Sequence, residues 1–233
     1  MRSKIIETVL ISGANRGLGL ALTERFAKAG WKVIAGCRNP GTAAALAALQ
    51  AQFEVQICKL DVTNPDDIAQ LADQLGAEPI DALINNAGIL DSNRTDISEI
   101  GDDEWRQIFA INSIAPVRMA LAFKGHLKRS PNPRIVTVSS EMGSLNRSLD
   151  GAIAYRASKA AVNKAMQALA TNFASDGITV CPIHPGWVRT DMGGAQAAIS
   201  PEESASGIFD LTTSLTKEMS GRFWTWDGTE HPW

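Results

Sequence analysis

Short apolar segments rich in β-branched residues alternate along this chain with longer segments that have helical periodicity. This alternation is typical of βαβ units, in which successive strands are parallel and helices cover both faces of the sheet. The pattern therefore predicts an α/β fold with a doubly wound parallel sheet of about seven strands. The predicted strands are Thr8–Ser12, Lys32–Cys37, Val55–Leu60, Ala82–Asn85, Arg134–Ser139, Thr179–His184 and Arg222–Trp224.

The segments between these strands carry helix start signals. Asn64 and Pro65 supply an N-cap and a first helical residue, and Ser200 and Pro201 repeat this pair. No linker, repeat or low-complexity segment divides the sequence, so we predict one doubly wound α/β domain over residues 1–233, with ligands at the carboxyl ends of the strands. The predicted helices lie near Gly17–Ala29, Thr42–Gln52, Pro65–Leu75, Asp103–Lys128, Ala154–Ala174 and Pro201–Lys217.

Composition excludes several classes of function. The net charge of −3, from 22 Lys and Arg against 25 Asp and Glu, gives no general attraction to nucleic acid or anionic lipid. We therefore expect no nucleic-acid partner, and the apolar segments are too short to predict a membrane span. Cys37, Cys58 and Cys181 lack the spacing of a metal site, so we predict no metal and three reduced core cysteines in a cytoplasmic protein.

A glycine-rich turn follows the first predicted strand and precedes a helix. Without Cβ atoms such a turn can tighten, and its backbone N–H groups can approach a pyrophosphate at the positive end of the helix. The spacing is G-x-x-x-G-x-G, which differs from the common G-x-G-x-x-G fingerprint. A structural turn or an unrelated phosphate site is the alternative. The turn reads Ser12-Gly13-Ala14-Asn15-Arg16-Gly17-Leu18-Gly19.

The second predicted strand ends in an arginine where an NAD-binding chain would carry an acid. Arg38 can form a bidentate, charge-assisted pair with the 2′-phosphate of NADP, and Arg16 can approach the same group. Two solvated arginines are the alternative. The sequence favours NADP(H) over NAD(H).

The chain contains one tyrosine, Tyr155, so a reaction that needs a phenol has one candidate. Lys159 follows four residues later, on the same face of a predicted helix. A neighbouring cation favours the phenolate, and we expect the pKa of Tyr155 to lie below the free value in the NADP complex. The alternative is a half-buried tyrosine beside a solvated lysine.

Two serines end the fifth predicted strand, shortly before Tyr155. The hydroxyl of Ser139 or Ser140 can bind and polarise a substrate carbonyl, although either residue can also serve only as a turn. Apolar residues follow on the same side of the sheet and are candidates for a substrate pocket, with plain packing as the alternative. They are Met142, Leu145, Trp187 and Met192.

A proline interrupts the longest predicted helix. Pro116 has no N–H for the carbonyl of Asn112, so the helix should kink there and leave an acceptor free. A water bound to this carbonyl can lead protons toward Lys159 and Tyr155. A break relieved only by solvent is the alternative.

Polar loops follow the remaining strands at the same edge. Asp61-Val62 and Asn86-Ala87-Gly88 can form ordinary turns, and Asp61 can cap the next helix. After the sixth strand, the backbone of Val188 and the hydroxyl of Thr190 can hold a carboxamide. We interpret His184 as a structural residue, because a Ser–His hydrolase would still need a nucleophile elbow.

Taken in this order, these motifs resemble the short-chain dehydrogenase/reductase family, and the whole chain is similar to its C-factor-like and sniffer-like carbonyl reductase branch. The resemblance implies a Rossmann-type fold and an NADP(H)-dependent reduction of an aldehyde or ketone. It implies Tyr155 as general acid, Ser140 as the group that orients the carbonyl, Lys159 as the cation beside the phenol and the nicotinamide ribose, and Asn112 as the anchor of a relay water.

The resemblance also implies the binding set for the cofactor. Asp61 would contact adenine, Asn86 the adenosine side and Thr190 the nicotinamide. The alternative function is an NADP(H)-binding signalling or regulatory protein with little or no turnover. The family further implies a homodimer or homotetramer formed through the helices Asp103–Lys128 and Ala154–Ala174. The predicted cofactor-binding residues are Gly13, Asn15, Arg16, Gly17, Leu18, Gly19, Arg38, Asp61, Val62, Asn86, Ala87, Gly88, Tyr155, Lys159, Val188 and Thr190.

Overall fold

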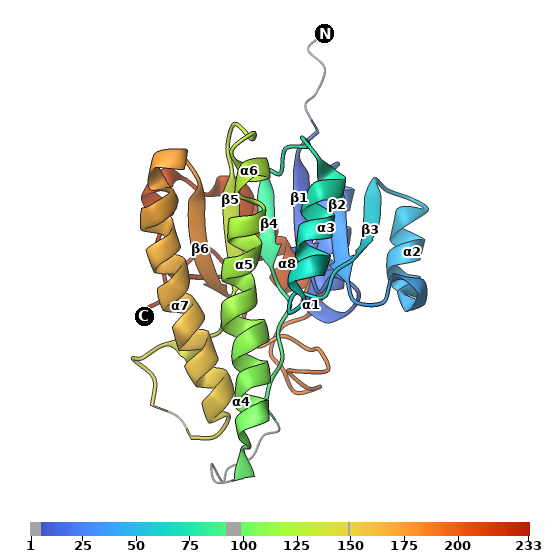
Figure 1. The fold of residues 1–233 in the computed structure, drawn as a ribbon. Helices are drawn as coiled ribbons and strands as arrows, with labels where there is room; N and C mark the ends of the chain where they lie inside the picture. The colour runs from blue at the N-terminus through green and yellow to red at the C-terminus, as the bar shows by residue number, and fades with distance from the viewer. Residues whose placement is uncertain (1–5, 92–98, 149) are drawn as a thin grey trace.

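The computed structural model describes residues 6–91, 99–148 and 150–233, and its strands form a seven-stranded parallel sheet (Figure 1). The strand order is β3-β2-β1-β4-β5-β6-β7. The chain therefore reverses direction across the sheet between β1 and β4, which confirms the predicted doubly wound fold. The strands are β1 (Thr8–Ser12), β2 (Lys32–Cys37), β3 (Val55–Lys59), β4 (Ala82–Asn85), β5 (Arg134–Val138), β6 (Thr179–His184) and β7 (Trp224–Thr225).

Helices bury both faces of this sheet, as Figure 1 shows. Residues of α1 (Gly17–Lys28), α2 (Ala44–Gln50) and α8 (Pro201–Ser214) form one hydrophobic core with the strands. Residues of α3 (Pro65–Leu75), α5 (Ala115–Ala122) and α7 (Ile153–Phe173) form a second core. The central strands are buried on both sides, which explains why they are continuous apolar runs and not alternating ones.

The predicted start signals act as caps. The side chain of Asn64 accepts a hydrogen bond from the amide of Asp66 at the start of α3. Ser200 and Glu203 form a complete capping box at the start of α8. Each cap satisfies backbone groups that the first helical turn leaves without a partner, so both helices begin where the sequence predicts.

The helical segment predicted over Asp103–Lys128 is interrupted beside Pro116, where the sequence predicts a kink. The structure has α4 (Asp102–Phe109), a π-helical turn η3 (Ala110–Ile114), α5, and α6 (Lys124–Leu127). The amide of Ala115 reaches back to the carbonyl of Ala110 in the wider π pattern. Pro116 follows at once and has no N–H to restore the α pattern, which is the physical reason for the break.

Other boundaries differ by a few residues. Strand β7 covers Trp224–Thr225 and not the predicted Arg222–Trp224, and β3 and β5 each end one residue earlier than predicted. Helix α2 begins at Ala44, because a short 3-10 turn occupies Pro40–Thr42.

The three cysteines are free and buried, as predicted. Among the described residues, none of the helices combines the length and apolar character that a membrane crossing requires.

Candidate active site

A cavity of about 850 Å³ runs along the edge where the parallel strands end. Every predicted cofactor-binding residue lines it, from the glycine turn after β1 to the loop after β6. Ser139, Ser140, Met142, Trp187 and Met192 also line the cavity, whereas the predicted pocket residue Leu145 does not. The loops brought together here are far apart in sequence, and the parallel sheet alone places them at one edge.

The glycine turn packs closely against the N-terminus of helix α1. Gly13 and Gly17 have positive φ angles of 67° and 51°, which L side chains rarely adopt. A Cβ on Gly19 would lie 2.1 Å from the carbonyl oxygen of Gly13, so only glycine allows the helix to approach the turn. The N-cap residue Arg16 makes no side-chain cap, and the first turn of α1 contains no acid. The helix therefore presents a positive N-terminus to the cavity, which suits an anion.

The loop after β4 supports this turn from the other side. The side-chain amide of Asn86 donates hydrogen bonds to the carbonyls of Ser12, at 3.0 Å, and Gly13, at 3.1 Å. The hydroxyl oxygen of Ser12 accepts hydrogen bonds from the backbone amides of Asn86 and Ala87. Asn86 therefore provides hydrogen-bond partners for the backbone of the glycine turn, which was the alternative interpretation of this residue. It also lines the cavity.

The two arginines of the predicted phosphate site have different surroundings. Arg38 is exposed at the end of β2 and lines the cavity, and its side chain has no ion pair within the described ranges. Arg16 instead pairs with Asp191 of the loop after β6, at 2.9 Å. This ion pair joins the two walls of the cavity. Both of its side chains are mostly exposed, so it contributes at most about 1 kcal/mol to stability.

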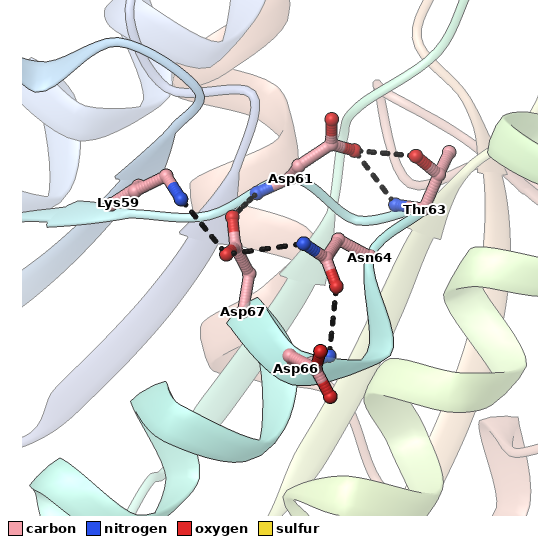
Figure 2. Close-up of polar contacts among 6 residues, drawn as sticks. All are labelled: Lys59, Asp61, Thr63, Asn64, Asp66 and Asp67. Atoms are coloured by element: carbon pink, nitrogen blue, oxygen red, sulfur yellow. Dashed lines mark hydrogen bonds and ion pairs between the residues drawn. The ribbon is translucent and has the colours of Figure 1, made fainter.

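Asp61 does not cap the next helix, which was the alternative to its place in the cofactor site. Figure 2 shows its side chain accepting two hydrogen bonds from Thr63, while its own amide donates to Asp67. Asn64 caps the helix, as predicted. The backbone hydrogen bond from Asp61 and the Lys59 ammonium lower the pKa of Asp67. Asp61 therefore remains on the wall of the cavity, with its turn fixed by Thr63.

The helix α7 carries Tyr155 and Lys159 into the cavity, both almost fully buried. The ammonium Nζ of Lys159 lies 5.5 Å from the centre of the Tyr155 ring. Burial lowers the pKa of Lys159 to about 8. Burial raises the pKa of Tyr155 to about 12, with a smaller contribution from the charge of Asp91, while a hydrogen bond with Ser140 lowers it. This direction is opposite to the one expected for the NADP complex.

The two candidate serines face different partners. Ser140 Oγ interacts with the phenol of Tyr155 and accepts the amide of Met142 at 3.1 Å. Ser139 Oγ lies 3.5 Å from the carbonyl oxygen of Lys159, to which it donates. The geometry therefore favours Ser140 as the hydroxyl that meets a substrate beside the phenol.

Asn112 lies in the π-helical turn and does not line the cavity. Its side chain accepts the amide of Ile89 at 2.9 Å and donates to the carbonyl of Ile89 at 2.8 Å and to Ser158 at 3.0 Å. A Cβ on Gly88 would lie 3.4 Å from Asn112 Oδ1 and 3.6 Å from Lys159 Nζ. Asn112 therefore binds the loop after β4 to helix α7, a side-chain role that the sequence did not reveal.

His184 is a structural residue in the described geometry. Its Nδ1 accepts the amide of Glu141, the residue after Ser140, at 3.1 Å. Burial, together with His231 and Arg147, lowers the pKa of His184 to about 4, so the imidazole is neutral at pH 7. Its neutral ring fixes the turn that carries Ser140.

The loop after β6 closes one side of the cavity. Thr190 Oγ1 accepts the amide of Gly193 at 3.2 Å, and Trp187 Nε1 donates to the carbonyl of Gly193 at 2.9 Å. A Cβ on Gly17 would lie 3.2 Å from the methyl group of Thr190. The sequence did not predict several further residues that line the cavity, because these residues belong to no recognisable motif. These include Thr63, Ile89, Leu90, Gln107, Glu141, Ala152 and Asp191.

A sequence model of the family described as short chain dehydrogenase matches residues 7–199. The chain is 38% identical to the C-signal of Myxococcus xanthus over 156 residues, which is 66% of this chain and 93% of that protein. The NADPH-bound carbonyl reductase from chicken fatty liver has a TM-score of 0.92 and 31% identity, covering 98% of this chain and 99% of that one. The carbonyl reductase Sniffer of D. melanogaster has a TM-score of 0.92 and 29% identity, covering 98% and 100%.

Proposed function

The chain belongs to the short-chain dehydrogenase family, and we propose that it is an NADPH-dependent reductase of aldehydes or ketones. One observation carries the proposal: a single cavity joins a turn suited to a dinucleotide phosphate to a buried phenol beside a buried ammonium. The similarity to an NADPH-bound carbonyl reductase supports the choice of cofactor and reaction.

The residues of the cavity fit NADP(H). The open N-terminus of α1 and the glycine turn would hold the pyrophosphate, and Arg38 would pair with the 2′-phosphate. Asp61 and Val62 would contact the adenine side. Thr190 and Val188 would hold the carboxamide of the nicotinamide. When bound, NADPH supplies the hydride that reduces the carbonyl carbon.

The side chains around Tyr155 would supply the proton. The hydroxyl of Ser140 would donate a hydrogen bond to the carbonyl oxygen and orient it toward the phenol. Tyr155 would then give its phenolic proton to the alkoxide oxygen as that charge develops. Lys159 stabilises the phenolate left behind, and a water bound at the backbone of Asn112 would return a proton from solvent. A phenol that is neutral at pH 7 is in the state that this step requires.

The substrate would contact an apolar and open part of the cavity. Met142, Ile89 and Met192 line it, and the Trp187 side chain is 54% exposed at its edge. The segment between Gly193 and Ser200 is short for a lid. Uncharged aldehydes and ketones with apolar substituents suit these walls.

We further propose that the chain forms a homodimer or homotetramer through α4, α5 and α7. Ile114 and Leu121 expose apolar side chains on this helical layer, where a second copy can cover them. Light scattering of the purified protein measures the molar mass, and the mass of one chain of 24.9 kDa would contradict the association.

NADPH oxidation in the presence of a panel of aldehydes and ketones tests the function, with Tyr155→Phe as the matched variant. The wild-type protein should oxidise NADPH with at least one carbonyl compound. The variant should retain NADPH binding and lose about a hundredfold or more of the rate, because it lacks the acid. Turnover that is unchanged by Tyr155→Phe would contradict the proposed acid.

A second candidate function is signalling through NADP(H) occupancy with little or no turnover. The similarity to a protein named C-signal favours it. Tight NADPH binding without oxidation by any compound of the panel would support this function over the reductase.

A further inference from the structure

The catalytic helix α7 begins without a cap of its own. Its N-cap residue is Ala152, which has no side-chain acceptor and adopts a left-handed backbone with φ 49° and ψ 42°. The first turn of α7 contains no acidic residue. The free amides at the start of this helix therefore need a partner from elsewhere in the chain.

Asp91 supplies that partner from the loop after β4. Its Oδ2 accepts the amide of Tyr155, the third residue of α7, at 3.3 Å. This is the bond that a cap residue normally makes from within its own helix. The residue that bears the candidate acid is therefore bound through its backbone to a carboxylate 64 positions earlier in the sequence.

The carboxylate of Asp91 is buried, with 5% of the residue exposed. Its second oxygen, Oδ1, has no hydrogen-bond partner among the described residues. A buried carboxylate with one free oxygen is costly unless positive charge lies close to it. The N-terminus of α7 provides such charge, because the backbone dipoles of a helix sum to a partial positive charge there.

The same N-terminus would favour ionisation of Tyr155, which lies in the first helical turn. Three groups act on the charge of the phenol: the hydroxyl of Ser140 after β5, the ammonium of Lys159 in the next turn of α7, and the carboxylate of Asp91, which contacts the backbone amide of Tyr155. Ser140 lowers the pKa of the phenol, whereas the negative charge of Asp91 raises it. Asp91 therefore opposes the effect of the helix N-terminus.

We propose that Asp91 is a positioning residue for Tyr155, whose carboxylate fixes the start of the catalytic helix and whose charge opposes loss of the phenolic proton. This inference rests on the proposed function, because it concerns the acid of the reduction. Burial holds Tyr155 in the form that donates a proton, and the charge of Asp91 adds to that effect. The charge of Asp91 is therefore one contribution to the protonated state of Tyr155, which reduction of a carbonyl requires.

Titration of the phenol in the cofactor-free protein tests this role. Tyr155 is the single tyrosine, so one ring-labelled tyrosine signal reports it without assignment. Asp91→Asn retains a side-chain oxygen for the amide of Tyr155 but removes the charge. We expect the phenol pKa to fall by about one unit, the low end of the effect of a nearby charge. At pH 11 the signal should then be about half ionised in the variant and about one tenth ionised in the wild type.

Asp66→Asn is the matched control, since Asp66 is an exposed carboxylate in the first turn of α3 and leaves Tyr155 untouched. Circular dichroism at the same pH establishes that each variant is folded. Asp91→Ser provides a second uncharged cap if Asp91→Asn does not fold, and it should lower the phenol pKa in the same direction.

A purely structural cap would give the same phenol titration in wild type and Asp91→Asn, and that result would overturn the proposal. A phenol pKa that rises in the variant would overturn it as well. The titration needs neither NADPH nor turnover. Failure of the reductase assay would therefore count against the proposed function alone, while an unchanged titration would count against the role of Asp91.

Discussion

The ammonium of Lys159 donates a hydrogen bond to the carbonyl oxygen of Val138, at 2.8 Å. This bond ties the second turn of α7 to the end of β5. The sheet edge therefore orients Lys159 directly, and its orientation does not depend on the phenol of Tyr155. Burial at this position lowers the pKa of Lys159 to about 8, which makes its charge a cost to the folded state.

Replacing Lys159 should stabilise the cofactor-free protein. The unfolded chain binds a proton at this residue up to its ordinary pKa of 10.5, whereas the folded chain releases it near pH 8, so the cost is full below pH 8 and vanishes above 10.5. At pH 7 the cost is about 3 kcal/mol, and loss of the bond to Val138 offsets about 1 kcal/mol. Lys159→Met should therefore raise the free energy of unfolding by about 2 kcal/mol.

Urea denaturation at pH 7, 8 and 9 measures this effect. The stability of wild type relative to Lys159→Met should rise over that range. Lys164→Met, an exposed lysine of the same helix, serves as control and should change stability by less than about 0.5 kcal/mol. Destabilisation by Lys159→Met at pH 7 would show that the buried ammonium is not a cost.

Cofactor preference should depend on Arg38. Arg38→Asp removes the cation proposed for the 2′-phosphate and places a carboxylate where NAD-binding chains use one. NADPH affinity should fall about 10- to 100-fold relative to NADH, as expected for loss of one charge-assisted hydrogen-bonded pair. Calorimetric Kd values for both cofactors measure the ratio, and Arg38→Gln separates loss of the cation from gain of the acid. An unchanged ratio would remove Arg38 from the phosphate site.

The state of Tyr155 should change when the oxidised cofactor binds. NADP⁺ places a positive nicotinamide in the cavity, and together with Lys159 this charge favours the phenolate. The pKa of Tyr155 should therefore fall from about 12 to below the free value of about 10. The labelled tyrosine signal, followed with and without NADP⁺, reports both values. A phenol that titrates normally in the complex would leave the fold intact and would undercut the proposed acid.

The side-chain hydrogen bonds of Asn112 should contribute to the stability of the folded protein. Asn112→Ala removes three hydrogen bonds and leaves both backbone groups of the half-buried Ile89 without that partner. We expect a loss of about 3 kcal/mol in the free energy of unfolding. Asn64→Ala removes one exposed helix cap and should cost about 1 kcal/mol. Equal losses in the two variants would contradict the bracing role of Asn112.

The strand pattern predicted the sheet well because buried parallel strands are apolar along their whole length. Asn64 and Ser200 likewise cap the helices that follow them, since a cap depends on only three or four neighbouring residues. Such local signals place the elements, and the rules for parallel sheets then bring Gly13, Arg38 and Tyr155 to one edge.

The parts that the sequence could not predict depend on contacts between distant segments. Arg16 was expected beside Arg38, but it pairs with Asp191 across the cavity. Asn112 was expected to act through its carbonyl, and its side chain turned out to bind the loop at Ile89. The direction of the Tyr155 pKa likewise follows from burial, which no spacing of residues reveals.

The π-helical turn at Ala110–Ile114 also determines the directions in which the side chains of the following helix α5 point. One extra residue in a turn rotates all later side chains by about 100°. Ile108, before the turn, packs with Ala154 of α7, whereas Met119, after it, packs into the core on one face of the sheet. A deletion of one residue within this turn would remove that rotation and carry Met119 away from that core. The length of chain between Ile108 and Met119 is therefore as constrained as the identity of the residues at either end.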